Sequence, residues 1–167
     1  ARELLNYSKA NILKLEINKK NIPIISYLSK KKFNVIAHIG VTPQSYSDFK
    51  KIKVVGRKEY ERKKLLSLAL DAEKAGAKAL LLECVVESVS KEITSALSIP
   101  TIGIGSSKFC DGQVLVFDDL VNFTDNKNYP KFVKKYLNFE KLARKAVNRF
   151  SRDVKLRKFP NKKYTYQ

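Results

Sequence analysis

The stretch NVIAHIGVTP, residues 34–43, joins a short apolar run to the signals that begin a helix. Residues 34–41 are mostly apolar and few in number, which is typical of a strand buried in a sheet. Thr42 is a residue type that caps helix N-termini, and proline is favoured at the first helical position, where Pro43 stands. We therefore expect a strand that leads directly into a helix.

The same order recurs along the chain. Apolar runs occupy residues 12–17, 34–41, 79–86, 100–105 and 113–118, and helical patterns occupy 22–30, 59–75, 87–97 and 139–153. Gly76 is a stop signal for the second helix, whereas residues 46–58 have no clear period and should form a loop. Strands that alternate with helices predict a parallel sheet. Five such units suit either a complete doubly wound sheet or part of a (β/α)8 barrel.

Size and composition favour one globular domain over residues 1–167, with a flexible tail at 159–167. The chain is 44% hydrophobic, which is enough for one core. The amphipathic segment 139–150 should pack its apolar side on that core. No run of about 18 apolar residues could span a bilayer, and the start lacks the order of a signal peptide. We therefore expect a cytoplasmic protein without a membrane partner.

The net charge of +18 raises the alternative of nucleic-acid binding. Most of the 34 basic residues are lysines scattered along the chain, whereas recognition of base edges and phosphates favours arginine. No motif that combines aromatic and basic residues for RNA binding is present. We expect a lysine-rich solvated surface and no nucleic-acid partner. If the protein instead bound nucleic acid in a way that weakened steeply with rising salt concentration, the alternative would hold.

Three other features of the sequence are weaker candidates for functional sites. Cys84 and Cys110 form no CxxC and no ligand cluster, so they are interpreted as reduced packing thiols. The glycine- and serine-rich residues 103–107 lack the third glycine and the lysine of known phosphate loops. Asp118 and Asp119 could bind a metal, but acids at a strand end often cap the next turn. The last two features stay unassigned.

Polar residues near the ends of the predicted strands are better candidates. Side chains alternate along a strand, so Lys14 and Glu16 share one face, His38 shares a face with Gly40, and Glu83 shares a face with Leu81 and Val85. Each lies towards the C-terminal end of its strand, where α/β sheets and barrels place their active sites.

Each candidate has a structural alternative. His38, the only histidine, could be a hydrogen-bonded core residue, and Lys14 with Glu16 could form an internal ion pair. Glu83 is harder to explain in that way, because it lies between Leu80–Leu82 and Cys84–Val86, and burial of a carboxylate costs several kcal/mol unless its charge is matched or protonated. Desolvation raises the pKa of a carboxylate, which suits a general base. Glu83 is therefore the leading candidate for a catalytic base.

Several short segments of the sequence match those of a known protein family. The sequence resembles the ketopantoate hydroxymethyltransferase (3-methyl-2-oxobutanoate hydroxymethyltransferase) family over almost its whole length. The matching blocks are KLE at 14–16, AHIGVTPQS at 37–45, KVVGR at 53–57, LLLECV at 80–85, IPTIGIG at 99–105 and CDGQVLVFDDL at 110–120. The resemblance implies a (β/α)8 TIM barrel of the phosphoenolpyruvate/pyruvate superfamily, of which this chain would supply strands four to eight. A chain that starts with Ala and contains no Met fits the expectation that an N-terminal segment precedes it.

The resemblance also implies a reaction and its participants. The family transfers a hydroxymethyl group from 5,10-methylenetetrahydrofolate to 3-methyl-2-oxobutanoate through a magnesium-stabilised enolate. The product is 2-dehydropantoate (ketopantoate), on the route to pantothenate and coenzyme A. Family members use Mg²⁺ and assemble into homo-oligomers, decamers by resemblance.

Site residues can be carried over onto matching positions. Glu83 would be the catalytic base that removes the C3 proton. Lys14 would bind the substrate carboxylate, and His38 would line the substrate pocket near the new hydroxymethyl group. Glu16 would join the Mg²⁺ site directly or through water.

The sequence differs from the family pattern in two loops, and it does not include the strands that carry two metal-binding residues of the family. Ile17-Asn18 stands where the family has glycines, and residues 105–108 differ from the corresponding family loop. The two metal-binding aspartates of the family belong to strands that are not in this sequence. We therefore expect residues 1–167 alone to be inactive, and a truncated fragment or scaffold without catalytic function stays the alternative.

Overall fold

The computed structural model describes residues 1–42, 53–123 and 129–166. Its contacts divide the chain into two compact units, Ala1–Val114 and Leu115–Gln167. Each unit is described by itself, and the expected single domain over 1–167 with a flexible tail at 159–167 stays a prediction. None of the helices in the described ranges is both long and apolar enough to cross a membrane.

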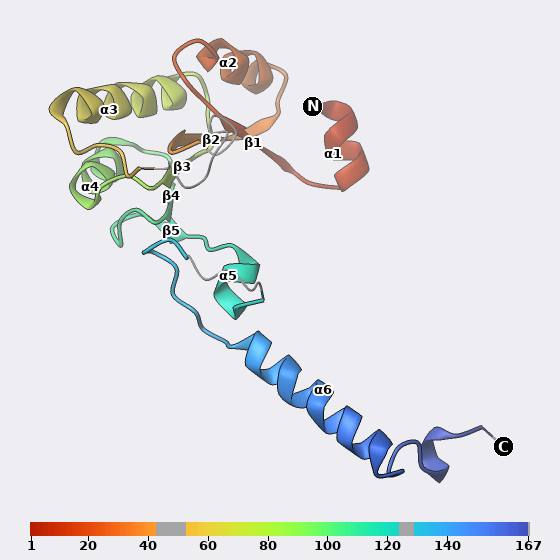
Figure 1. The fold of residues 1–167 in the computed structure, drawn as a ribbon. Coiled ribbons are helices and arrows are strands. Elements are labelled where there is room, and N and C mark those ends of the chain that lie inside the picture. Colours follow the sequence, from red (N-terminus) through yellow and green to blue (C-terminus); the bar gives the residue numbers. More distant parts are fainter. Residues whose placement is uncertain (43–52, 124–128, 167) are drawn as a thin grey trace. The chain divides into compact units, whose positions relative to one another are not determined.

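The first unit is a five-stranded parallel sheet with intervening helices (Figure 1). In chain order its elements are α1 (Arg2–Ser8), β1 (Ile12–Glu16), α2 (Ile22–Lys30), β2 (Asn34–Gly40), α3 (Glu59–Lys74), β3 (Ala79–Glu83), α4 (Glu87–Ala96), β4 (Thr101–Ile104) and β5 (Gly112–Gln113). The strands lie side by side in the order β1-β2-β3-β4-β5, and every neighbouring pair is parallel. A doubly wound sheet would reverse its strand order at a switch point. The unbroken order is consistent with part of a TIM barrel.

One face of the sheet packs against α2, α3 and α4. The strand residues in this core are Leu13, Val35, Ala37, Ile39, Leu80 and Leu82, and Ile17, which directly follows β1, also belongs to it. The helix residues in it are Ile25, Leu28, Leu65, Leu68, Ala69, Ala72, Val89 and Ile93. Burying one such aliphatic side chain contributes roughly 1.5–3 kcal/mol. Stability therefore comes mainly from this face, and the opposite face is available for polar residues.

The end of the sheet differs from expectation. The sequence predicts a strand over 113–118, but β5 covers only Gly112–Gln113 and the short helix α5 (Phe117–Val121) follows. Asp118 and Asp119 lie in the first turn of that helix, where their charges are favourable near the positive end of the helix dipole. The strand prediction beyond residue 113 is therefore wrong, because the two acids favour a helix start.

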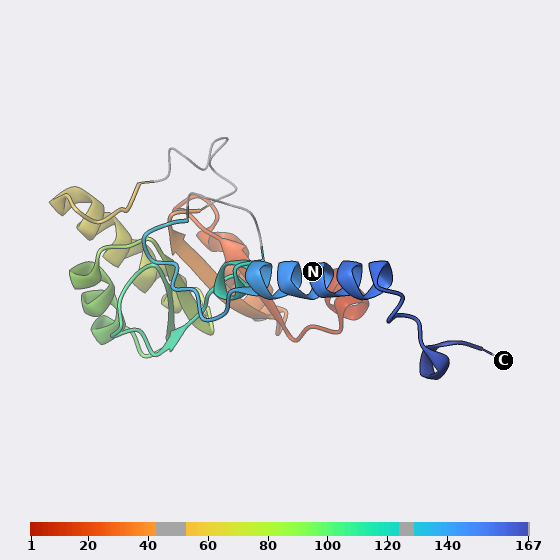
Figure 2. The same ribbon diagram turned by 60° about the horizontal axis from the view of Figure 1, so that its bottom comes forward.

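The second unit is mainly one long helix. α6 (Phe139–Lys155) is an uninterrupted helix that is followed by a short 3-10 turn at Lys162–Tyr164 (Figure 2). The helix forms where the sequence predicts it, and within the second unit none of its residues is buried. The expected packing of 139–150 on a core stays a prediction. The ring of Phe159 lies against those of Phe150 and Tyr164, at centroid distances of 5.5 Å and 5.7 Å.

Two sequence predictions fall partly outside the described residues. The expected helix start at Thr42-Pro43 lies outside them from Pro43 onward, and so do the first residues of the predicted loop 46–58. The described end of that loop runs beside β3, because Val55 forms an isolated parallel bridge with Val85.

Candidate functional site

The candidate site lies at the C-terminal ends of three adjacent strands, on the face that the helices do not cover. Glu16 at the end of β1 pairs in register with His38 of β2, and Gly40 of β2 pairs with Glu83 at the end of β3. Because side chains alternate along each strand, Glu16, His38 and Glu83 leave the sheet on the side opposite to the apolar core. The structure thus brings together three of the four predicted residues.

His38 lies between the two glutamates. Its Nε2 atom is 3.1 Å from Oε2 of Glu83, and its Nδ1 atom is 3.9 Å from Oε1 of Glu16. The imidazole side chain is only 1% exposed, whereas those of Glu16 and Glu83 are 15% and 18% exposed. The carboxylates of Glu16 and Glu83 are therefore partly accessible to solvent, whereas the imidazole of His38 is not.

The polar atoms of this group are not fully paired within the described part of the chain. Glu16 Oε2 and both ring nitrogens of His38 are buried without a hydrogen-bond partner there. The close approach of His38 Nε2 to Glu83 is not aligned as a hydrogen bond. A buried polar atom that lacks a partner costs about 1–3 kcal/mol, so unpaired groups concentrate at places where a ligand, ion or water completes them. Within the described residues, His38 is therefore not a core histidine whose hydrogen bonds are satisfied by its neighbours.

Lys14 occupies the same face of β1 two residues before Glu16, opposite Ile36 of β2. The residue is exposed, and it forms no ion pair with either glutamate among the described residues. The alternative interpretation of Lys14 and Glu16 as an internal ion pair is therefore not supported by the structure.

Gly40 is a site residue to which the sequence patterns assign no role. Its φ is +98°, and a Cβ added there would lie 2.3 Å from the backbone oxygen of Glu83. The next residue, Val41, donates its N–H to that same oxygen at 2.8 Å. Only glycine allows this approach without strain, so Gly40 sets the spacing between β2 and β3 beside Glu83. The one signal in the sequence was a glycine at a strand end.

Both cysteines behave as the sequence predicts. Cys84 and Cys110 are free and buried. Burial, together with the neighbouring charge of Glu83, raises the pKa of the Cys84 thiol to about 11. The thiol beside the candidate base is therefore neutral at physiological pH and is not an activated nucleophile.

The described residues contain only part of a possible metal site. No group of three or more His, Cys, Asp or Glu side chains within them is arranged to hold a metal ion. Glu16 nevertheless offers a buried carboxylate oxygen without a partner, which is the kind of ligand that Mg²⁺ prefers. Magnesium is commonly bound by one or two carboxylates plus water and substrate oxygens. Glu16 therefore fits as one magnesium ligand.

Comparison with known proteins identifies the family. Residues 1–162 match the family model described as ketopantoate hydroxymethyltransferase. The chain is 45% identical over 166 residues to the 3-methyl-2-oxobutanoate hydroxymethyltransferase of Pelagibacter ubique. This alignment covers 99% of the chain and 63% of that protein. Proteins of the same name from Thermotoga maritima and Campylobacter curvus are 44% and 40% identical. These matches cover 94% and 100% of the chain, and 58% and 62% of the two relatives.

The chain thus spans about three-fifths of the length of these curated relatives. The family match extends over both units, and the aligned region includes the strands that carry Glu16, His38 and Glu83. The chain belongs to the ketopantoate hydroxymethyltransferase family.

Proposed function

We propose that this protein transfers a hydroxymethyl group from 5,10-methylenetetrahydrofolate to 3-methyl-2-oxobutanoate to give ketopantoate for pantothenate synthesis. The names of the relatives support the reaction class. The observation that carries the proposal is the cluster in which the buried imidazole of His38 lies between the partly exposed carboxylates of Glu16 and Glu83, on the face of the sheet opposite to the apolar core. We propose a cytoplasmic homo-oligomer as its working form.

Glu83 is the proposed base. A carboxylate oxygen takes the C3 proton of the keto acid, the electrons of the C–H bond move towards the carbonyl, and an enolate results. The C3 carbon then bonds to the one-carbon unit of the folate, whose two bonds to nitrogen break in the course of the transfer. One water is consumed: its oxygen becomes the new hydroxyl, and the folate leaves as tetrahydrofolate after taking up the proton from C3 and one proton from water. Glu83 suits this role because its carboxylate is partly exposed on the side that substrate can reach.

The other residues bind and orient. Lys14 is exposed on the same face and would pair with the substrate carboxylate, which fixes the end of the molecule remote from C3. His38 would line the pocket beside Glu83 and close to the new hydroxymethyl group. Glu16 would help to hold Mg²⁺, which, when bound, supplies positive charge that stabilises the enolate oxygen.

The test is exchange of the C3 proton in D₂O, measured by NMR on protein expressed from the complete gene, with Mg²⁺ and the keto acid but without folate. Exchange should occur in the wild type and vanish in Glu83→Gln. Glu87→Gln is the matched control, because Glu87 is an exposed acid in the first turn of α4. Exchange that survives in Glu83→Gln would remove the assignment of the base.

A non-catalytic fragment or scaffold is the second candidate, and it is favoured because residues 1–42, 53–123 and 129–166 contain no group of three or more acidic, His or Cys side chains that could hold a metal ion. We propose that these residues by themselves do not sustain the reaction. The same exchange experiment on the isolated 167-residue chain separates the two candidates, since measurable exchange there would eliminate the second.

A further inference from the structure

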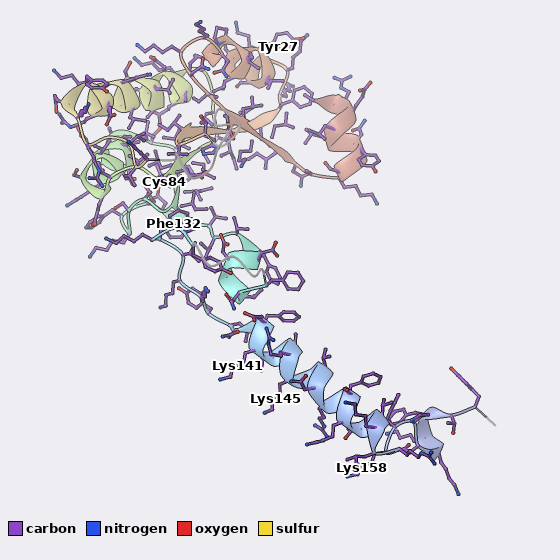
Figure 3. The ribbon with its side chains drawn as sticks, viewed as in Figure 1. Tyr27, Cys84, Phe132, Lys141, Lys145 and Lys158 are labelled. Carbon is purple, nitrogen blue, oxygen red and sulfur yellow. The ribbon has the colours of Figure 1, made fainter. Side chains whose placement is uncertain are left out.

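The backbone turns in an unusual way directly after the proposed base. Cys84 has a φ of 51°, in the left-handed region that residues with a Cβ rarely adopt. Within the described ranges the other non-glycine residues with positive φ stand at or just beyond the C-terminus of a helix, where this conformation is common. They are Lys9, Lys32, Asn122 and Arg157. Cys84 instead stands at the end of a strand, between β3 and α4 (Figure 3).

Hydrogen bonds hold this turn from three sides. The carbonyl oxygen of Glu83 accepts from Val41 N at 2.8 Å, and the N–H of Cys84 donates to Ile104 O at 3.0 Å. The carbonyl oxygen of Cys84 accepts from Val55 N at 2.9 Å. The peptide between Glu83 and Cys84 is therefore fixed on one side by the end of β2 and on the other by β4, and the next peptide is fixed by the segment before α3.

The consequence of the turn is that β3 ends at Glu83. An extended residue at position 84 would prolong the strand and carry the chain past β2 and β4. The left-handed residue instead directs Val85 towards Val55, with which it forms a bridge. Glu83 is thus the last side chain on the polar face of β3, at the level of the interstrand pair with Gly40.

Sparsely populated backbone conformations persist where the surrounding structure over-determines them, and they cluster at active sites. The thiol itself offers no competing explanation, because it is buried and its high pKa keeps it protonated. The feature that distinguishes position 84 is the backbone and not the sulfur.

We propose that Cys84 is a positioning residue whose left-handed backbone aims the carboxylate of Glu83 at the reacting carbon. This inference rests on the proposed function, in which Glu83 removes a proton. It assigns to Cys84 no contact with substrate and no chemical step.

The experiment compares three substitutions in protein expressed from the complete gene. Cys84→Gly permits positive φ freely, Cys84→Ala removes the thiol but keeps a single Cβ substituent, and Cys84→Val adds a β-branch that disfavours positive φ. The Val variant should lose roughly 100-fold in kcat, the effect expected of a misplaced catalytic group, while KM for the keto acid changes little. The Ala and Gly variants should keep kcat close to that of the wild type.

A change in the chemical step separates positioning from a merely structural role. With substrate deuterated at C3, the isotope effect on kcat should be larger in Cys84→Val than in the wild type, because proton removal becomes more rate-limiting. Simple loss of folded protein would lower the active fraction without changing the isotope effect or KM. Cys110→Val is the matched control, since Cys110 is also a buried free cysteine but lies outside the positive-φ set. Cys84→Thr, also β-branched, replaces the Val variant if that variant does not fold.

The outcomes are distinct. A Val or Thr variant with kcat and isotope effect equal to the wild type overturns the positioning role while leaving the proposed function intact. Equal losses in the Gly and Ala variants would assign the role to the thiol and would also overturn it. A wild type without C3 exchange would instead defeat the proposed function itself.

Discussion

His38 Nε2 lies 3.1 Å from Oε2 of Glu83, with the imidazole almost entirely removed from solvent. The exposed part of Glu83 is therefore limited to the side away from His38, and the imidazole restricts the positions that the carboxylate can take. Glu16 approaches the other ring nitrogen at 3.9 Å. One buried ring thus sets the separation between the proposed base and the proposed metal ligand.

Replacing His38 should reduce turnover more than substrate affinity. In His38→Ala the carboxylates lose the group that separates them, and Glu83 can rotate away from the substrate. We expect kcat to fall roughly 100-fold, in the range attributed to a misplaced or missing acid–base group. Steady-state kinetics of the hydroxymethyl transfer measure this, and far-UV circular dichroism controls for folding. A variant with normal kcat would show that His38 is only a packing residue.

Replacing Lys14 should weaken substrate binding. Lys14 is exposed and has no ion-pair partner in the described part of the chain, so its charge is free for the carboxylate of the keto acid. A hydrogen bond to a charged group contributes about 1.5–3 kcal/mol, so Lys14→Gln should raise KM by about 10-fold or more with a smaller change in kcat. Lys64→Gln, at an exposed position of α3, is the control. Equal KM values in the two variants would contradict the assignment.

The side-chain pattern of the sheet could be predicted from the sequence. The strands near 12–17, 34–41, 79–86 and 100–105 are confirmed within a few residues, and the polar residues Glu16, His38 and Glu83 lie towards the C-terminal ends of their strands as expected. This worked because strand periodicity is a local property, and parallel neighbours align their C-terminal ends. The contact between His38 and Glu83 follows from the register of β2 with β3, which the sequence alone did not provide.

The backbone features of the site could not be predicted in the same way. The positive φ of Gly40 and of Cys84 depends on which neighbouring segments accept or donate hydrogen bonds at the strand ends. A cysteine carries no propensity for that conformation, so its sequence pattern gave no sign of it. The short β5 was missed for a related reason, because the apolar run 113–118 is shared between a two-residue strand and the start of a helix.

The stability of the first unit should depend on pH through Glu73. Its Oε1 atom accepts hydrogen bonds from the Ser98 hydroxyl, the Ser98 N–H and the Ile99 N–H. These bonds, led by that of the Ser98 hydroxyl, lower the pKa of Glu73 below its ordinary value of 4.5. A carboxyl whose pKa is lower in the folded state stabilises the fold above its unfolded pKa, and this contribution is lost as pH falls through the folded value.

Thermal unfolding of Glu73→Gln should therefore show a lower Tm than the wild type at pH 7, by a few degrees, about 2–4 °C for each kcal/mol lost. The difference should shrink as the pH is lowered below 4.5, where the wild-type carboxyl also becomes protonated. A Tm difference that stays constant from pH 7 to pH 3 would contradict the link to Glu73 ionisation.

Adding one methyl group at Gly40 should disturb both stability and turnover. In Gly40→Ala the new Cβ would meet the backbone oxygen of Glu83 at 2.3 Å, and a backbone atom cannot move aside as a flexible side chain can. The positive φ adds strain, of the order of 1–3 kcal/mol. Gly112→Ala is the matched control, because a Cβ there would have its nearest neighbour, a side-chain atom of Ile102, at 3.9 Å. We expect Gly40→Ala to lower Tm clearly more than Gly112→Ala does.

Relief of the clash would move Glu83 relative to His38, so kcat per folded molecule should also fall. Equal Tm values and equal kcat in the two variants would show that the approach of β2 to Glu83 does not shape the site.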